Sequence, residues 1–134
     1  MPHEPLFHNK IMYLEDCDFT KDGRLSLPSP YNGKISLVMM FASWCGHCQK
    51  AKEHFSKIPE LLGNDVVVCV INGSGKGKSS QSEQDLMKRV KNITPDFRGF
   101  PHIVVFGKDG KLLGSHEGQR TAEEIVKTVH KYSS

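Results

Sequence analysis

The sequence is poor in the features that would assign it to a specialised class of protein. Its 134 residues include one tryptophan and four cysteines, too few cysteines for a disulfide-stapled scaffold of this length. The net charge at pH 7 is only +3 and the basic residues are scattered, so no footprint for nucleic acid or an anionic membrane is present. The longest apolar run, residues 35–45, is far shorter than the roughly 20 residues of a bilayer-spanning helix. We therefore expect one globular domain that binds neither nucleic acid nor membrane.

The first residues do not resemble a secretion signal. Residues 1–5 carry an acid and two prolines where a signal peptide has a basic end and an apolar run. The expected compartment is therefore the cytoplasm. A secretory lumen is the alternative if the natural N-terminus is missing from the sequence.

Apolar periodicity predicts an alternation of strands and helices. The expected strands are 11–14, 35–42, 65–72, 101–106 and 111–115, and the expected helices are 46–62, 83–93 and one that begins at 121. Pro59 should bend or restart the first helix, and Ser82 should cap the second. Thr121 should open the third helix with a capping box. This order, with a hairpin turn at 108–111, predicts an α/β fold with a mixed sheet and helices on both faces.

Cys45 and Cys48 form a Cys-x-x-Cys pair at the junction of a buried strand and a helix. The unpaired amides of a first helical turn, together with the helix dipole, stabilise a thiolate at Cys45. Cys48 follows one helical turn later, within reach of the first sulfur, and His47 adds a donor or a positive charge. Gly46 leaves the first sulfur uncovered, and Trp44 offers an apolar wall to an incoming polypeptide. The pattern predicts a redox-active thiol pair.

A metal site is the alternative interpretation of such a pair. Zinc needs two further ligands, but no second Cys-x-x-Cys or His-x-x-His occurs, and Cys17 and Cys69 lie in separate segments. Haem attachment requires a histidine directly after the second cysteine, where Gln49 stands. We therefore expect no metal and no organic cofactor. Cys17 and Cys69 are expected to be two inert thiols, with a disulfide between them as the alternative.

Three segments resemble one protein family, in the family's own order. Residues 41–48 (FASWCGHC) resemble the active-site segment of thioredoxin-fold proteins, and the Gly-His pair is similar to protein disulfide isomerase catalytic domains and unlike thioredoxin. Residues 97–106 (FRGFPHIVVF) resemble the segment around the family's cis-proline. Residues 118–125 (GQRTAEEI) are similar to the isomerase segment whose arginine approaches the active site. The resemblance covers about residues 35–130 and implies a thioredoxin-like fold.

The resemblance also implies roles for individual residues. Cys45 would be the nucleophile and Cys48 the resolving thiol. Pro101 would be cis and would let the Phe100 backbone pair with an extended substrate, the alternative being a trans proline that starts an edge strand. Arg120 would swing toward Cys48 and favour its thiolate, the alternative being a solvated arginine beside a helix start. The partners implied are protein thiols and disulfides, together with an unidentified thiol oxidase or reductase.

The implied function is thiol–disulfide exchange of the isomerase or oxidase type. A thioredoxin-type reductase is the alternative within the same chemistry, and a protein-binding module with idle cysteines is the alternative outside it. The predicted organisation is an N-terminal extension at 1–34, with a possible first strand, and a thioredoxin-like domain at 35–134. We expect a monomer. Because single-domain relatives of this type occur in large DNA viruses, a viral or virion-associated setting is a further alternative to the cytoplasm.

Several positions depart from the family pattern. Met39 stands where the family buries an acid six residues before the first cysteine, and Cys69 aligns with the lysine that partners this acid. His102 replaces the threonine that usually follows the cis-proline, and its ring either stands beside the cysteines or packs on the sheet. The Gly- and Lys-rich segment 73–79 is one residue short of a phosphate-binding loop, and the alignment places it at the end of the fold opposite the cysteines.

Overall fold

The computed structural model describes residues 10–133, which surround a five-stranded mixed sheet. The strand order is β1-β3-β2-β4-β5, with bounds Met12–Tyr13 (β1), Ile35–Phe41 (β2), Val66–Asn72 (β3), His102–Phe106 (β4) and Leu112–Ser115 (β5). β1, β3 and β2 run parallel, whereas β4 is antiparallel to both β2 and β5. The mixed α/β sheet predicted from the order of the elements is confirmed.

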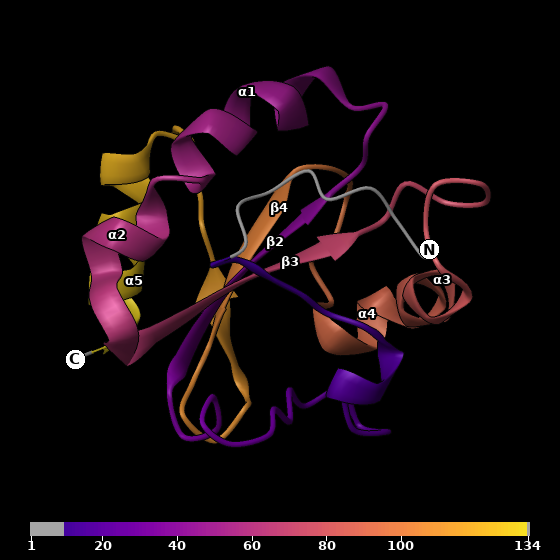
Figure 1. Cartoon of the computed structure of the whole chain (residues 1–134), viewed down its shortest axis with the longest axis horizontal. Helices are drawn as coiled ribbons and strands as arrows, with labels where there is room; N and C mark the ends of the chain where they lie inside the picture. Colours follow the sequence, from indigo (N-terminus) through magenta and orange to yellow (C-terminus); the bar gives the residue numbers. More distant parts are fainter. Residues whose placement is uncertain (1–9, 134) are drawn as a thin grey trace.

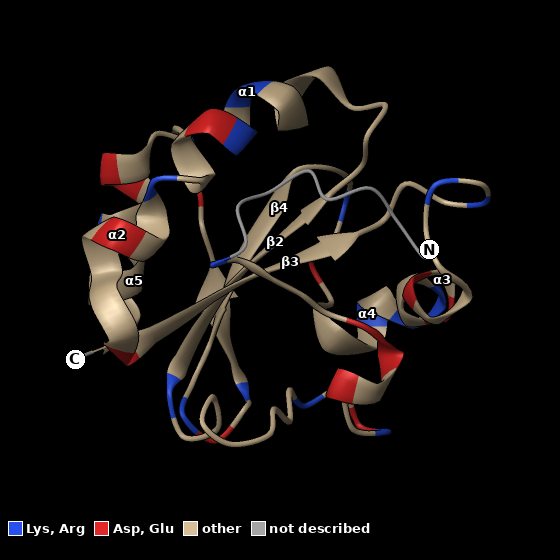
Figure 2. Cartoon of the chain, in the orientation of Figure 1, with Lys and Arg blue, Asp and Glu red and all other residues tan. Residues whose placement is uncertain are grey.

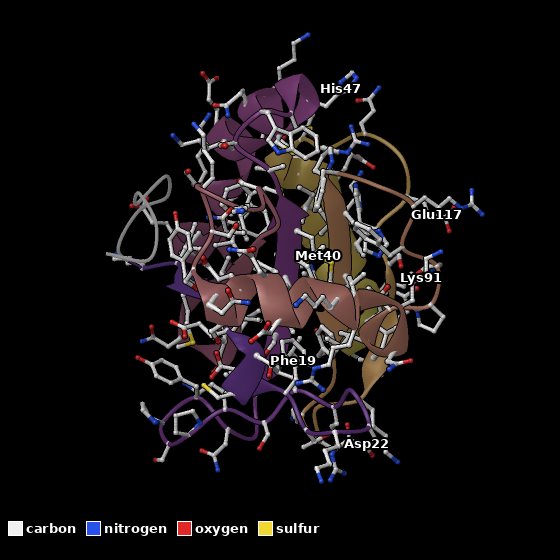
Figure 3. All side chains as sticks on the ribbon, turned by 90° about the vertical axis from the view of Figure 1, so that its right-hand side faces the viewer. Phe19, Asp22, Met40, His47, Lys91 and Glu117 are labelled. Atoms are coloured by element: carbon white, nitrogen blue, oxygen red, sulfur yellow. The ribbon has the colours of Figure 1, made fainter. Side chains whose placement is uncertain are left out.

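Helices cover both faces of the sheet (Figure 1). The helices are α1 (Gly46–Phe55), α2 (Ile58–Leu62), α3 (Gln81–Lys88), α4 (Val90–Ile93) and α5 (Ala122–Ser133), with short 3-10 turns at Asp16–Asp18 and Gly63–Asp65. α1, α2 and α5 pack on one face, and α3 and α4 pack on the other. All seven residues of β2 are buried because this strand is covered on both sides. Alternate residues of β2 therefore face two different cores: Met39 lies in the α1 core, whereas Met40 lies beside α3 (Figure 3).

Residues 10–34 are part of this packing. β1 pairs with β3, and Leu14, Phe19 and Leu25 are buried in the core on the α3 side. Asp16 makes an ion pair of 2.8 Å with Arg89, whose guanidinium also donates to backbone carbonyls of this segment. The segment therefore closes the core on the α3 side of the sheet.

The helix boundaries confirm two sequence predictions and correct a third. α1 ends before Pro59, which stands in the first turn of α2, so the predicted restart is confirmed. The Oγ of Thr121 accepts the N–H of Glu124 at the start of α5, which confirms Thr121 as the cap and the first of the two hydrogen bonds of the predicted capping box. The predicted cap at Ser82 is wrong: Ser80 caps α3 in a reciprocal capping box with Glu83, while the Oγ of Ser82 accepts a backbone N–H from the N-terminal segment. Glu83 stands three residues after Ser80, and this spacing selects the earlier serine.

The predicted helix 83–93 is two helices, α3 and α4, separated at Arg89. The side chain of Arg89 is bound to the N-terminal segment, so a long-range contact fixes the break. Within residues 10–133, no helix combines the length and apolar character that crossing a membrane requires.

Candidate active site

Cys45 lies where the central strand β2 gives way to α1. Its N–H donates to the carbonyl of Ala42 (3.1 Å), which turns the chain over the end of the strand. The Sγ of Cys45 then caps α1 by accepting the backbone N–H of Cys48 at 3.3 Å. This N–H is one of the donors that a first helical turn leaves unpaired, so the helix end stabilises negative charge on the Cys45 sulfur.

Cys48 is the more deeply buried of the two thiols, with 2% of its surface exposed against 8% for Cys45. Burial, followed by the hydrogen bond and charge of Cys45, raises the pKa of the Cys48 thiol to about 12. A hydrogen bond with the Ala42 backbone and, to a smaller extent, the positive charge of Arg120 lower the same pKa. Both cysteines are thiols in this structure. Cys45 is therefore the sulfur that is nearer to solvent, and Cys48 is protonated at neutral pH.

The segment before β4 approaches the Cys45 sulfur from the other side. The Phe100–Pro101 peptide bond is cis, and the thiol of Cys45 donates to the carbonyl oxygen of Phe100 at 3.5 Å. The Phe100 ring packs edge-on against Trp44 and Phe97, at centroid distances of 5.7 and 5.4 Å. Trp44 is 65% exposed, so an apolar wall stands beside Cys45 in contact with solvent.

The segment after β3 holds this wall in place. The indole N–H of Trp44 donates to the Ser74 carbonyl (2.9 Å), and the N–H of Ser43 donates to the Ser74 Oγ (2.7 Å). The expectation that residues 73–79 lie opposite the cysteines is therefore wrong. Because β2 and β3 are parallel, both strands end at the same edge of the sheet (Figure 1). The hydrogen bonds of Ser74 join the two segments that follow these strands.

Gly73 is a site residue that the sequence analysis missed. A Cβ at this position would lie 2.5 Å and 2.7 Å from two ring atoms of Phe100 and 3.3 Å from the methyl of Met87. The ring therefore occupies the space of the absent side chain. The signal was a glycine directly after a buried strand, which indicates a close approach, although the sequence does not name the partner.

Gly46 and His47 form the start of α1. Both are exposed, and in the part of the chain that the structure describes nothing lies within 4 Å of a Cβ placed at Gly46. Figure 3 shows His47 at the outer end of the molecule, on α1. The first turn of α1 thus leaves the approach to Cys45 free of side chains from position 46, as the sequence predicts.

A groove of about 510 Å³ runs along the side of Pro101 that faces the β5–α5 connection. Arg98, Pro101, Glu117 and Arg120 are among its lining residues. The structure thus brings Arg120 to the cis-proline segment, exposed to solvent and near enough for its charge to act on Cys48. Within residues 10–133, no three His, Cys, Asp or Glu side chains are grouped in a way that would hold a metal ion.

Comparison with known proteins identifies the family. The model of the thioredoxin-like domain matches residues 29–133. The chain belongs to the thioredoxin-like family. A thioredoxin-like protein of Invertebrate iridescent virus 6 is 29% identical over 140 residues, covering 96% of this chain and 99% of the viral one. The family resemblance stated from the motifs is confirmed.

Relatives of the disulfide isomerase type are larger. A protein disulfide isomerase-like protein of Oryza sativa is 32% identical over 103 residues, covering 74% of this chain but only 17% of the rice protein. The first thioredoxin domain of mouse protein disulfide-isomerase A4 superposes with a TM-score of 0.62 at 26% identity, covering 96% of this chain and 79% of that one. The chain therefore corresponds to a single thioredoxin domain of such proteins. These similarities support its membership of a thiol–disulfide oxidoreductase family.

The family's buried acid–lysine pair is absent. Met39 occupies the position of the acid as predicted, but Cys69 does not occupy the position of the lysine. Met39 is fully buried in the core with Cys45 and Cys48, and its partner across β3 is Val70. Cys69 pairs with Val38 and lies in the core on the other face. Because successive strand residues face opposite sides, a register error of one residue moved Cys69 to the wrong face.

Cys17 and Cys69 are separate thiols, so the alternative of a disulfide between them is wrong for this structure. Cys17 is exposed on the 3-10 turn Asp16–Asp18. Cys69 is fully buried in β3, and burial raises the pKa of its thiol well above the usual range.

His102 packs on the sheet, which decides between the two alternatives left by the sequence. Its Nε2 lies 2.8 Å from the Oγ of Thr94 and 3.6 Å from a carboxylate oxygen of Asp96. Its ring packs edge-on against Phe97 at 5.5 Å. As the first residue of β4, His102 faces the α3 side, where its neighbour Met40 also points. Burial lowers the pKa of this histidine, and the charge of Asp96 opposes that effect.

Proposed function

We propose that the protein catalyses thiol–disulfide exchange on protein substrates, in the manner of a disulfide isomerase or oxidase. The observation that carries the proposal is the environment of the Cys45 sulfur. It caps a helix, lies 3.3 Å from the N–H of Cys48 and 3.5 Å from the Phe100 carbonyl, and stands beside an exposed tryptophan. The helix end, through the N–H of Cys48, stabilises negative charge on this sulfur, and a second thiol is within one helical turn. The Phe100 carbonyl, which accepts the Cys45 thiol here, is a backbone group that an extended substrate chain can pair with in its place.

In the reducing direction, the Cys45 thiolate attacks one sulfur of a substrate disulfide. A bond forms between Cys45 and that sulfur, the substrate S–S bond breaks, and the leaving thiolate takes a proton. The Cys48 thiolate then attacks the Cys45 sulfur, which forms the Cys45–Cys48 disulfide and releases the second substrate thiol. Two electrons pass from the protein to the substrate. In the oxidising direction, each step runs backward and a separate thiol oxidase restores the disulfide.

The surrounding residues have supporting roles in this proposal. Trp44, Phe100 and Pro101 form the surface on which the substrate segment lies. Gly46 keeps the sulfur accessible, and His47 offers a donor or a positive charge next to it. The roles assigned to these residues rest on their positions around Cys45 and on the family resemblance.

Arg120 acts on the second half of the cycle. Cys48 needs to lose its proton before it attacks, and burial opposes that loss. Met39 offers no carboxylate to accept the proton, so the Cys48 thiolate is favoured by its hydrogen bond with the Ala42 backbone and by the positive charge of Arg120. Water at the exposed side of the pair is then the proton acceptor.

Two cysteine variants test the mechanism. Cys45→Ser should abolish turnover of a peptide disulfide, because no nucleophile remains. Cys48→Ser should accumulate mixed disulfides between Cys45 and the substrate, because attack proceeds and resolution does not. Mass spectrometry after acid quenching measures the adducts, and Cys17→Ser is the matched control that should behave as the parent protein. Full activity of both active-site variants would disprove the mechanism.

The reduction potential of the Cys45–Cys48 pair decides whether the protein oxidises or reduces its substrates. A helix end under Cys45, the Gly-His pair and the missing acid at Met39 all favour the thiolate form, hence a more oxidising couple. We expect a value nearer the disulfide isomerase potential of about −180 mV than the thioredoxin potential of about −270 mV. A value at or below the thioredoxin potential would identify a reductase.

We propose a cytoplasmic setting, and the similarity to a viral protein supports the virion-associated alternative.

A further inference from the structure

The segment between β3 and α3 is a braced loop next to the active site. Inside it, the N–H groups of Lys78 and Ser79 donate to the Gly75 carbonyl at 3.0 and 2.8 Å. The Ser79 Oγ donates to the Asn72 carbonyl (3.0 Å) and accepts the N–H of Gly75 (3.1 Å). The Asn72 side chain donates to the Lys78 carbonyl at 3.1 Å. Side chains at both ends therefore fix the path of the loop, residues 73–80.

The same loop is fastened to the apolar wall beside Cys45. Ser74 receives the indole N–H of Trp44 and the backbone N–H of Ser43, and the N–H of Gly73 donates to the Phe41 carbonyl at 2.7 Å. Gly73 also gives space to the Phe100 ring. A polypeptide that lies across Trp44 therefore has this loop as its next neighbour.

The loop presents positive charge only. Lys76 and Lys78 are exposed, and no described acidic side chain lies within ion-pair distance of either. Figure 2 shows blue and no red on the loop after β3. The first turn of α1 also lacks acidic residues, and Lys50 is exposed on that helix. Among residues 10–133, the loop and the start of α1 on the Trp44 side of the active site therefore carry exposed lysines and no acidic partner for Lys76 or Lys78.

We propose that the 73–80 loop is a recognition wall for substrates, and that Lys76 and Lys78 select protein segments with acidic residues next to the reactive cysteine. The inference rests on the proposed thiol–disulfide exchange and names its substrate class. Exposed charges act over about 8–10 Å at physiological salt, which covers a neighbouring substrate residue. Like charges placed against each other are penalised, so a basic segment is rejected by the same surface.

The test compares three disulfide probes in single-turnover reactions of the reduced protein. Two are peptide disulfides of identical sequence, except that the residues flanking cysteine are glutamates in one and lysines in the other. The third is 2-hydroxyethyl disulfide, which is small and uncharged. We expect the parent protein to prefer the glutamate peptide about tenfold in second-order rate constant at low salt, with the preference shrinking as salt rises.

Charge-reversal variants assign the preference to the loop. Lys76→Glu with Lys78→Glu should remove or reverse the preference while leaving the rate with 2-hydroxyethyl disulfide unchanged. Lys108→Glu with Lys111→Glu changes the net charge equally at the β4–β5 hairpin, which lies at the opposite edge of the sheet because β4 starts beside Cys45 and runs away from it. This control pair should keep the preference.

The possible results separate this inference from the proposed function. Equal rates for the two peptides in the parent protein, or an equal loss of preference in both double variants, would overturn the recognition role of the loop. Failure of the parent protein to reduce 2-hydroxyethyl disulfide would instead overturn the thiol–disulfide exchange itself.

Discussion

Replacing Gly73 by alanine should disturb the active site from a strand end that carries neither reactive cysteine. The added methyl would stand 2.5 Å and 2.7 Å from two atoms of the Phe100 ring, whereas real Cβ atoms essentially never lie closer than 3.0 Å to a neighbour. The ring has little room to yield, because Trp44 and Phe97 pack on it at 5.7 and 5.4 Å and the methyl of Met87 is 3.3 Å from the same point. Either the ring moves and loses these contacts, or the strand end shifts.

Both routes have a similar cost. Overpacking a filled site costs about 1–3 kcal/mol, and each aromatic pair that separates costs about 0.5–1.5 kcal/mol. A loss of about 2 kcal/mol in the free energy of unfolding lowers the Tm of a domain of this size by about 6–10 °C. Because the Phe100 carbonyl is 3.5 Å from the Cys45 sulfur, we also expect kcat/KM for a peptide disulfide to fall on the order of tenfold.

Thermal unfolding and a double-mutant cycle measure the effect. Phe100→Leu removes the ring atoms that the new methyl meets, so Gly73→Ala should cost much less in that background, with a coupling of at least about 1 kcal/mol. Gly46→Ala is the stability control, because nothing described lies within 4 Å of its Cβ and alanine favours a helix. Costs that add within about 0.3 kcal/mol would show that Gly73 does not make room for Phe100.

Two further predictions concern titratable groups. Arg120→Gln should lengthen the lifetime of the mixed disulfide about two- to fivefold in quenched-flow experiments, because losing an exposed positive charge raises the pKa of Cys48 further. Arg120→Lys keeps the charge and should resolve the mixed disulfide at the parent rate. Equal resolution rates for all three proteins would contradict this role of Arg120. Burial favours the neutral ring of His102, so its contribution to stability is complete above the unfolded pKa of about 6.5 and is lost as pH falls below that value. Denaturant unfolding of His102→Thr should therefore lose less stability between pH 6.5 and 5 than the parent protein, and parallel curves would refute the assignment.

The active-site pair is determined by local sequence. A continuously apolar strand followed by Cys-Gly-His-Cys and a helical stripe places a cysteine at a helix start, and only residues within a few positions are needed for that inference. The order of strands and helices fixed the mixed sheet for a similar reason, since parallel neighbours require a crossover and antiparallel neighbours accept a hairpin.

The tertiary structure alone decided which distant segments meet at those cysteines. Ser74 and Gly73 support Trp44 and Phe100 because parallel strands β2 and β3 end at one edge, a register that local periodicity does not specify. The sequence comparison assigned Cys69 to the face of Met39, whereas the strand register places it on the opposite face, because side chains alternate along a strand and a shift of one residue reverses the face. The break at Arg89 depends on carbonyls about 70 residues away in sequence. Local patterns determine the elements and the reactive thiols, whereas contacts between them depend on register and on burial, which only the folded chain defines.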